Sequence, residues 1–202
     1  MTSIAAVILA GGKGERLGGV NKALLTIGND RFIDRAMAAT ASCAPRLLAV
    51  GHAPFESPAG LIPLPDLEAD YAGPLAGVAA GVEYLKDVQV DLLFSLAVDT
   101  PLFPRDFLDR ALPLLETAPA VIACYGEQDY PTNAVWRLLA LSGLPDALRK
   151  GTAPRSLKRL VEALGAVRLD YAPLNHFDPF RNANTPEDLT FLRDLEARDT
   201  RG

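Results

Sequence analysis

Residues 9–22 make up a glycine-rich segment of the kind that binds phosphate groups. The segment reads Leu-Ala-Gly-Gly-Lys-Gly-Glu-Arg-Leu-Gly-Gly-Val-Asn-Lys and contains five glycines. Because glycine lets the backbone approach a ligand closely, such a loop presents a row of N–H groups, an arrangement that binds anions. Arg16 adds a guanidinium suited to phosphate oxygens, and Lys22 adds a compact positive charge. The alternative interpretation is a glycine-rich turn with incidental basic residues.

The segment fits neither of the two best-known glycine motifs. The dinucleotide-binding fingerprint requires G-x-G-x-x-G, and Leu17 stands where its third glycine belongs. The Walker loop requires Gly-Lys followed by Ser or Thr, whereas Gly19 is followed by Val20. We therefore expect a phosphate-binding loop of another type.

Asp99 is the second candidate for chemistry. It opens the sequence Asp-Thr-Pro directly after an apolar run at 92–98. A carboxylate at the end of a strand is well placed to hold Mg²⁺, which takes one or two carboxylates together with substrate phosphate oxygens. The alternative interpretation is an Asp that opens a turn before Pro101.

Strands and helices must alternate along the chain to position these residues. Short apolar runs rich in β-branched residues predict strands, and apolar residues at helical spacing predict helices. Such alternation implies a three-layer α/β/α fold with a mostly parallel, Rossmann-like sheet. Ligands lie beyond the carboxyl ends of strands in such sheets, which places Gly11, Gly51 and Asp99 along one edge. The predicted strands are 4–9, 47–50, 61–64 (an edge strand, because of Pro63), 91–98, 120–125 and 132–136, and the predicted helices are 32–43, 74–85, 105–116, 156–164 and 185–197.

Length and composition indicate one soluble domain over residues 1–202. The chain is 49% hydrophobic and 22% charged, and its length allows a full core without disulfides or metal staples. Its net charge of −5 and pI near 5.1 argue against a general nucleic-acid binder. Cys43 and Cys124 have no metal-ligand spacing, so we expect reduced, buried thiols. With no signal-peptide pattern and no apolar run of membrane-spanning length, we expect a cytoplasmic protein without membrane or nucleic-acid partners.

The loop pattern L-A-G-G-x-G-x-R-L-G-G-x-x-K closely resembles the signature of nucleotidyltransferases that activate a phosphate or sugar phosphate with a nucleoside triphosphate. Among these it is most similar to the molybdenum cofactor guanylyltransferases. Two positions depart from the family pattern, because Leu17 replaces the usual Met and Asn21 replaces the usual Asp. Neither change removes a charge that contacts phosphate. The resemblance implies a nucleotidyltransferase fold and nucleotide contacts from Leu9, Ala10, Gly11, Gly12, Gly14 and Lys22.

Two further segments extend the resemblance toward the nucleoside. Residues 66–77 resemble the family's second motif, D-x-x-x-x-x-G-P-L-A-G, which implies that Asp66 contacts the nucleoside. The turn of Gly73, Pro74 and Leu75 would then lie against the base and ribose, where small residues leave room for a flat ring. The alternative is a plain junction between a loop and a helix. Gly51 stands where the family often has a nucleotide-binding Asn, and here it offers only backbone.

Residues 180–189 resemble the family's late motif, F-x-N-x-N-T-P-E-D-L. The resemblance implies that Asn182 and Asn184 border a pterin substrate, and two residues spaced by two in an extended segment point to the same side. The alternative is that Asn184 only supports the helix cap made by Thr185. Residues 131–133, Arg155 and Arg159 are candidates for binding the same anionic substrate, or else form a solvated face.

The reaction that the resemblance implies is transfer of GMP from Mg²⁺·GTP to the terminal phosphate of molybdopterin or its molybdenum form, with release of pyrophosphate. A phosphate monoester is already ionised near neutral pH, with a second pKa of about 6, so no general base is required. The family's D-x-P motif binds the metal, which favours Asp99 as the Mg²⁺ ligand. Arg16, Lys22 and Asp99 would then act by positioning and by neutralising charge.

Three alternatives remain open at the level of the sequence. A cytidylyltransferase for the same pterin typically has L-A-A-G in the loop, so Gly11-Gly12 favours guanine. A sugar-phosphate nucleotidyltransferase would lack the late motif. A non-catalytic nucleotide-binding module for cofactor delivery would not need a metal carboxylate at the α-phosphate. We also expect transient contact with proteins that supply or receive the cofactor.

Overall fold

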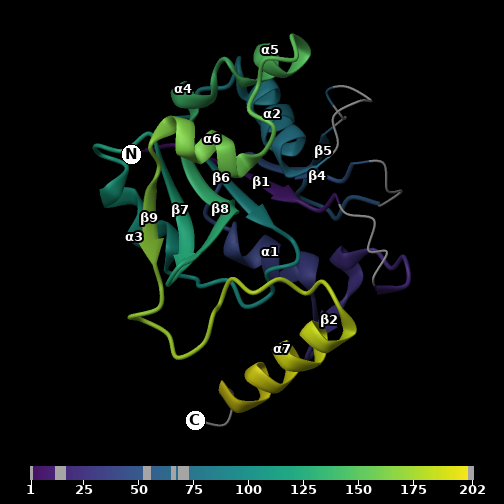
Figure 1. The fold of residues 1–202 in the computed structure, drawn as a ribbon. Coiled ribbons are helices and arrows are strands. Elements are labelled where there is room, and N and C mark those ends of the chain that lie inside the picture. Colours follow the sequence, from purple (N-terminus) through teal and green to yellow (C-terminus); the bar gives the residue numbers. More distant parts are fainter. Residues whose placement is uncertain (1, 12–16, 52–55, 65–66, 68–72, 200–202) are drawn as a thin grey trace.

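A seven-stranded sheet lies between two layers of helices in the computed structural model (Figure 1). The model describes residues 2–11, 17–51, 56–64, 67 and 73–199. The strand order is β5-β4-β1-β6-β8-β7-β9. This architecture confirms the predicted three-layer α/β fold. The strands of the sheet are β1 (Ile4–Leu9), β4 (Arg46–Ala49), β5 (Ile62–Leu64), β6 (Leu92–Ala97), β7 (Ala120–Tyr125), β8 (Gln128–Arg137) and β9 (Val167–Asp170).

All neighbouring strands in the sheet run parallel except at β8, which is antiparallel to both β6 and β7. The reversal follows from a tight turn after β7, where Gly126 has a φ of 56° and lets the chain double back at once. The predicted edge strand is also present, because β5 carries Pro63 at one border of the sheet. Outside this sheet, β2 (Thr26–Ile27) pairs with β3 (Asp30–Arg31).

The two faces of the sheet bury separate hydrophobic clusters. Successive residues of β1 alternate between them, with Ala6 and Ile8 in one cluster and Val7 and Leu9 in the other, as the two-residue period of a strand requires. One face is covered by α1 (Phe32–Ala39), α3 (Phe107–Leu114) and α7 (Pro186–Asp199). The other is covered by α2 (Pro74–Leu85), α4 (Leu138–Leu141), α5 (Leu144–Arg149) and α6 (Leu157–Leu164) (Figure 1).

Several predicted helices differ from the structure at their ends. The helix predicted over 32–43 stops at Ala39, and Thr40 is its C-cap, with a buried hydroxyl that donates to the Ala36 carbonyl. The helix predicted over 105–116 spans only Phe107–Leu114. The short elements α4, α5 and β9 were not predicted, because four to six residues are too few for a periodic pattern to emerge.

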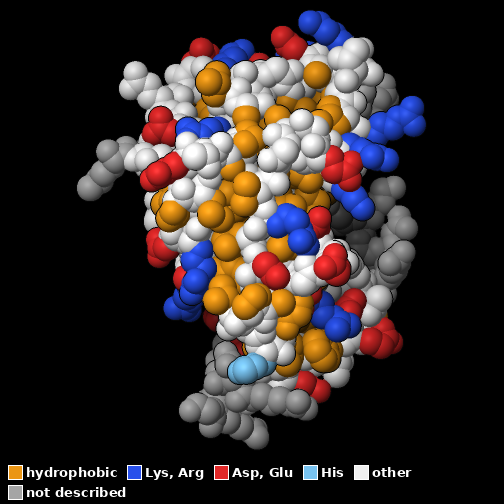
Figure 2. All heavy atoms as spheres, turned by 60° about the vertical axis from the view of Figure 1, so that its left-hand side comes forward, with side chains coloured by type: hydrophobic (Ala, Val, Ile, Leu, Met, Phe, Trp, Pro, Cys, Tyr) orange, Lys and Arg blue, Asp and Glu red, His pale blue; other side chains and the backbone are white. Residues whose placement is uncertain are grey.

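Charges of both signs border a band of hydrophobic side chains on the face that Figure 2 shows. The edge strand β9 carries the exposed Val167 beside Arg168, whose Nε lies 2.6 Å from a carboxylate oxygen of Asp129 on β8. Charged side chains on an edge strand hinder pairing with other chains.

Both cysteines are buried and free, as predicted. Of the helices in the described ranges, none is long and apolar enough to cross a membrane.

Helix α2 packs against the sheet through two glycines that have different room around them. A Cβ on Gly77 would lie 2.7 Å from Leu9 Cδ2 and 3.0 Å from Ala49 Cβ, whereas a Cβ on Gly81 would meet Val7 at 3.6 Å. The first contact is too close and the second is ordinary. Gly77 therefore allows α2 to lie close to β1 and β4.

We expect Gly81→Ala to stabilise the fold by up to about 1 kcal/mol, because alanine is the better helix former. Gly77→Ala gains the same propensity, but its Cβ must displace the Leu9 side chain and crowds Ala49 Cβ on β4, at a cost of about 1–3 kcal/mol for overpacking. Urea unfolding followed by the fluorescence of Trp136, the one tryptophan, measures both changes. Equal stability of the two variants would contradict this account of the packing.

Candidate active site

The carboxyl ends of β4, β1 and β6 meet at one edge of the sheet. Backbone bonds continue the pairing just past the strands, from Ala10 N to Ala49 O (2.8 Å) and from Val98 N to Leu9 O (3.0 Å). A Cβ on Gly11 would lie 3.4 Å from the backbone nitrogen of Gly51. The structure thus brings Leu9, Ala10, Gly11, Gly51 and Asp99 to neighbouring positions, through the strand alternation read from the sequence.

Lys22 and Asp99 form an ion pair at this edge. The Lys22 Nζ lies 2.7 Å from Asp99 Oδ2 and 2.5 Å from Asn184 Oδ1. The Lys22 and Asp99 side chains are only 15% and 17% exposed, so the charges are screened less by solvent than a surface pair would be. Three segments far apart in the sequence therefore meet at one ammonium group.

A short 3₁₀ turn presents Lys22. The turn, Lys22–Leu24, is capped by Asn21, whose side chain accepts a hydrogen bond from the backbone N–H of Ala23 at 3.0 Å. Asn21 is the position at which this chain departs from the family's usual Asp. Both residues cap well, so the change leaves the local support of Lys22 intact.

A compact turn after β6 presents Asp99. The Thr100 hydroxyl donates to the Ala97 carbonyl at 2.7 Å, and the Thr100 N–H reaches the same carbonyl at 3.3 Å. The Asp99 carbonyl accepts the N–H of Ala183 at 2.9 Å. Asp99 therefore opens a turn, which was one of the two alternatives considered for it, and directs its carboxylate to Lys22. Its role as a Mg²⁺ ligand stays a prediction.

The late segment is anchored from two sides. Phe180 is fully buried among other rings, with ring centroids 5.1 Å from Tyr171 and 5.6 Å from both Phe103 and Tyr130. Its backbone N–H donates to Asp178, whose carboxylate also accepts from the Tyr130 hydroxyl. Burial raises the pKa of Tyr130, which keeps that hydroxyl a donor. Sequence reasoning missed this anchor, for which only the phenylalanine at the start of the motif was a signal.

A capping box at the start of α7 supports the segment from the other side. The Thr185 hydroxyl accepts the N–H of Asp188 at 3.2 Å, and the Asp188 carboxylate accepts the N–H of Thr185 at 3.1 Å. Asp188 also accepts the N–H of Asn184 at 3.2 Å and pairs with Arg181. This is the cap predicted from Thr-Pro-Glu-Asp. The backbone N–H of Asn184 takes part in this cap, while its side-chain oxygen accepts a hydrogen bond from Lys22.

A cavity of about 150 Å³ opens where these elements meet. Its wall includes Pro74 at the start of α2, where Gly73 has a φ of 107° that side-chain-bearing residues rarely adopt. Within the described part of the chain, the buried Oδ1 of Asn182 has no hydrogen-bond partner. The residues that line the cavity are Leu9, Ala10, Gly11, Lys22, Pro74, Ala97, Val98, Asp99, Thr132 and Asn182.

Some predicted residues lie elsewhere or outside the description. Arg155 is exposed before α6 and is not among the described residues that line the cavity, so the structure does not place it at this site. Leu75 follows Pro74 but is buried in the hydrophobic cluster of α2. Gly12, Gly14, Arg16 and Asp66 lie outside the described residues.

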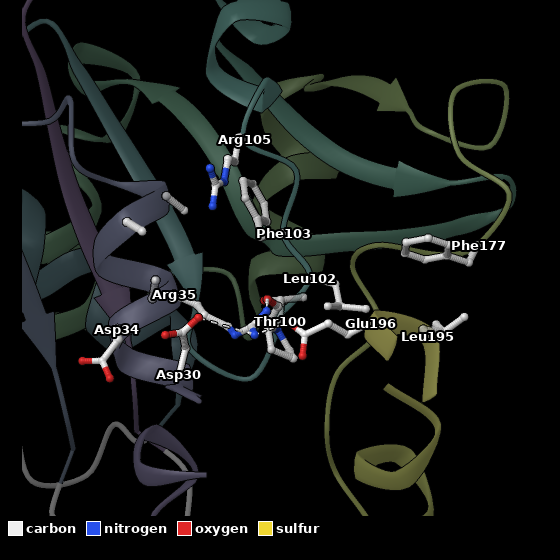
Figure 3. Close-up of a pocket in the computed structure, with 14 residues that line it drawn as sticks. Asp30, Asp34, Arg35, Thr100, Leu102, Phe103, Arg105, Phe177, Leu195 and Glu196 are labelled. Carbon is white, nitrogen blue, oxygen red and sulfur yellow. Dashed lines mark hydrogen bonds and ion pairs between the residues drawn. The ribbon is translucent and has the colours of Figure 1, made fainter. Parts of the chain in front are cut away.

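A second cavity, of about 400 Å³, lies between α1, α7 and the segment after Asp99 (Figure 3). Arg35 reaches across it, donating to the carbonyls of Ile27 (2.9 Å) and Pro101 (3.5 Å) and pairing with Glu196. These bonds tie α1 and α7 to the turn that carries Asp99. The cavity is larger than the one at the strand ends, but its central arginine is already engaged with the protein.

Comparisons with known proteins identify the family of this chain. Residues 6–168 match the family described as the MobA-like NTP transferase domain. The chain belongs to this family. It is therefore a nucleotidyltransferase, which confirms the resemblance read from the loop and favours an enzyme over a non-catalytic module.

The relatives cover nearly the whole chain. A protein of Rhodobacter capsulatus named molybdenum cofactor guanylyltransferase is 35% identical over 192 residues, covering 95% of each chain. One of the same name from Acidiphilium cryptum is 38% identical over 186 residues, covering 91% of each. Family membership thus rests on the full length and not on the loop alone.

Solved structures share the fold. Molybdopterin-guanine dinucleotide biosynthesis protein A of Archaeoglobus fulgidus superposes with a TM-score of 0.71 at 21% identity, over 96% of this chain and 99% of its own. A 2-C-methyl-D-erythritol 4-phosphate cytidylyltransferase of Thermus thermophilus gives a TM-score of 0.69 at 21% identity, over 97% and 100%. Proteins with different named substrates share the fold, so the site must decide between them.

The capping box predicts a stability that depends on pH. Burial raises the pKa of Asp188, but bonds from Arg181 and from the amides of Asn184 and Thr185 outweigh it and leave the pKa lowered. A lowered pKa stabilises the fold above the ordinary value of about 3.9, and this stability is lost as the pH falls through the lowered value.

We expect Asp188→Ala to lower the free energy of unfolding at pH 7 by about 1 kcal/mol, the usual worth of a cap. The difference from the unsubstituted protein should shrink as the pH falls below about 4. Glu187→Ala, at an exposed neighbour in the same turn, is the matched control and should cost less. If the loss of unfolding free energy in Asp188→Ala does not change with pH, the charge of Asp188 has no such role.

Proposed function

We propose that this enzyme transfers GMP from GTP, with Mg²⁺, to the terminal phosphate of molybdopterin or its molybdenum form. An oxygen of the molybdopterin phosphate attacks the α-phosphorus of GTP. The bond between that phosphorus and the oxygen bridging the α- and β-phosphates breaks, and pyrophosphate leaves. The observation that carries the proposal is the meeting of Lys22, Asp99 and Asn184, which joins the glycine-rich loop, the D-x-P turn and the late segment. The names of the relatives support guanosine and the pterin.

The donor set around Asp99 suits Mg²⁺. No group of three or more Asp, Glu, His or Cys side chains that could hold a metal occurs among the described residues, so a dedicated cage is not what this part of the chain offers. Mg²⁺ is usually bound by one or two carboxylates plus substrate phosphates, and Asp99 supplies one carboxylate at the cavity wall. When bound, the ion would neutralise charge on the triphosphate and on the leaving pyrophosphate.

Each predicted residue of the nucleotide site then has a proposed role. Lys22 neutralises phosphate charge, and the backbone of residues 9–11 with Gly51 lies where a nucleotide approaches the strand ends. The base and ribose lie against Gly73 and Pro74 in this proposal, and Leu75 supports that turn from the hydrophobic cluster of α2. Gly12, Gly14, Arg16 and Asp66 complete the nucleotide site in this proposal. No side chain is asked to remove a proton, since the attacking phosphate is already ionised.

The proposed contacts with the pterin come mainly from the late segment, residues 180–189. Among the residues that the structure describes, none bonds the buried acceptor of Asn182 at the cavity wall. An unpaired buried polar atom is costly unless a ligand satisfies it. Asn184 contacts Lys22, so any contact it makes with the pterin lies next to the reacting phosphates. Arg155 remains a proposed pterin ligand because of its positive charge alone. We further propose one domain over residues 1–202, a cytoplasmic location, and transient contacts with proteins that supply or receive the cofactor.

We expect Lys22→Ala and Asp99→Ala each to lower turnover at least about a hundredfold, the scale for loss of a transition-state contact. Lys150→Ala and Asp146→Ala remove the same charges from exposed positions on and after α5 and should leave turnover nearly unchanged. Pyrophosphate release from GTP with molybdopterin and Mg²⁺ measures all four. Near-normal rates for either site variant would refute its assigned role.

Each of the four nucleoside triphosphates is offered separately with Mg²⁺ and molybdopterin. We expect pyrophosphate release with GTP and not with the other three. The choice of guanine rests on Gly11-Gly12, where a cytidine-specific relative has Ala-Gly and so more crowding near the base. Omitting molybdopterin, or replacing it with a sugar phosphate, serves as the control. Release with CTP alone would reassign the enzyme as a cytidylyltransferase, and release with a sugar phosphate alone would move the acceptor.

A further inference from the structure

Strand β8 contains an irregularity beside the candidate active site. On its β7 side, Ile122 pairs with Ala134 but the next residue, Ala123, pairs with Tyr130, so residues 131–133 stand opposite a single step of β7. On its β6 side, the pairing runs from Leu92 with Arg137 to Ser95 with Ala134. The segment 131–133 therefore bulges where the register with β7 shifts and the pairing with β6 ends. Bulges often redirect side chains next to active sites.

The bulge directs two side chains toward the turn that carries Asp99. Thr132 lines the same cavity as Lys22 and Asp99. Asn133 is completely buried, and its Oδ1 accepts the N–H of Ala97 at 2.9 Å. The same oxygen lies 3.3 Å from the Thr100 hydroxyl. Asn133 thus contacts the residues at both ends of the turn, while Asp99 lies between them.

Asn133 takes the place of a missing strand partner. The N–H of Ala97, at the end of β6, would otherwise be a buried donor at the point where the pairing with β8 ends. An amide oxygen satisfies that donor and leaves the following residues free to turn. In the described structure its Nδ2 is buried without a hydrogen-bond partner, which is costly for a side chain kept only for stability. Local departures of this kind are expected at functional sites.

We propose that Asn133 is a positioning residue for Asp99: its side-chain oxygen fixes the turn at 97–100 so that the Asp99 carboxylate faces the metal and triphosphate. This inference rests on the proposed function, because it takes Asp99 to hold the metal. Asn133 touches no substrate, since it is completely buried. Thr132, exposed to the cavity through the same bulge, is the neighbour that meets the ligand.

The test compares Asn133→Leu with Ser95→Ala. Leucine keeps the branched shape and the number of side-chain heavy atoms but accepts no hydrogen bond. Ser95 is also fully buried at the β6–β8 boundary, where its hydroxyl accepts the Trp136 Nε1–H at 2.9 Å, yet it does not contact the Asp99 turn. Both variants lose a buried bond between the same two strands. Thr100→Val, which removes the hydroxyl beside Asn133, is the second variant and carries the test if Asn133→Leu does not fold.

The measurement is binding of Mn²⁺, a paramagnetic substitute for Mg²⁺, in the presence of GTP and without the acceptor. We expect Asn133→Leu to weaken Mn²⁺ binding about tenfold, the equivalent of one hydrogen bond, and Thr100→Val to weaken it in the same direction. Ser95→Ala should bind Mn²⁺ within about twofold of the unsubstituted protein, a change of well under one hydrogen bond. Amide hydrogen exchange over 97–100 should accelerate in Asn133→Leu and not in Ser95→Ala.

The outcomes separate the two levels of the argument. If Asp99→Ala weakens Mn²⁺ binding while folded Asn133→Leu and Thr100→Val bind it normally, Asn133 does not position Asp99 and the inference falls while the proposed function stands. If Ser95→Ala weakens Mn²⁺ binding as much as Asn133→Leu does, the inference is also overturned. Any lost bond between β6 and β8 would then be enough to weaken Mn²⁺ binding. If the unsubstituted protein and Asp99→Ala bind Mn²⁺ equally, the proposed metal site is wrong and the inference falls with it.

Discussion

The ion pair between Lys22 and Asp99 is the interaction on which the geometry of this site depends. Removing either charge from water is costly unless an opposite charge compensates it, and both side chains are mostly buried. The pair is possible only because β1 and β6 are parallel neighbours, so that the segments following them leave the sheet at the same edge. The fold therefore sets the site, and the ion pair holds two of its segments together.

Strand β8 reaches this edge of the sheet differently from its parallel neighbours. Parallel strands end at the edge and collect their loops there. The antiparallel β8 approaches that edge from beyond it, and its bulge at 131–133 delivers Thr132 to the cavity and Asn133 to the turn. A parallel strand in the same position would begin its course at the opposite edge.

The sequence predicted the scaffold better than the contacts. Alternating apolar runs were sufficient to predict the three layers, and the position of Asp99 after a buried strand was sufficient to place it beside Gly11. Asn184 shows the limit, because the sequence allowed a pterin contact or a helix cap and the structure adds a hydrogen bond to Lys22. That contact joins residues 162 positions apart, and no local pattern encodes such a distance. Asn133 stood among residues 131–133, the candidates for substrate binding, but the structure buries it and bonds its side chain to Ala97, a contact that no periodic signal in the sequence indicated.

The contact between Lys22 and Asn184 has a consequence for how the two halves of the site communicate. An ammonium group has three N–H donors, and Asp99 and Asn184 accept two of them. Lys22 belongs to the loop assigned to the triphosphate, and Asn184 belongs to the segment assigned to the pterin. A change in the position of either segment must alter the hydrogen bonds available to the other. Aromatic packing around Phe180 and the capping box of α7 limit such movement, so the late segment is held rigidly enough to fix where Lys22 points.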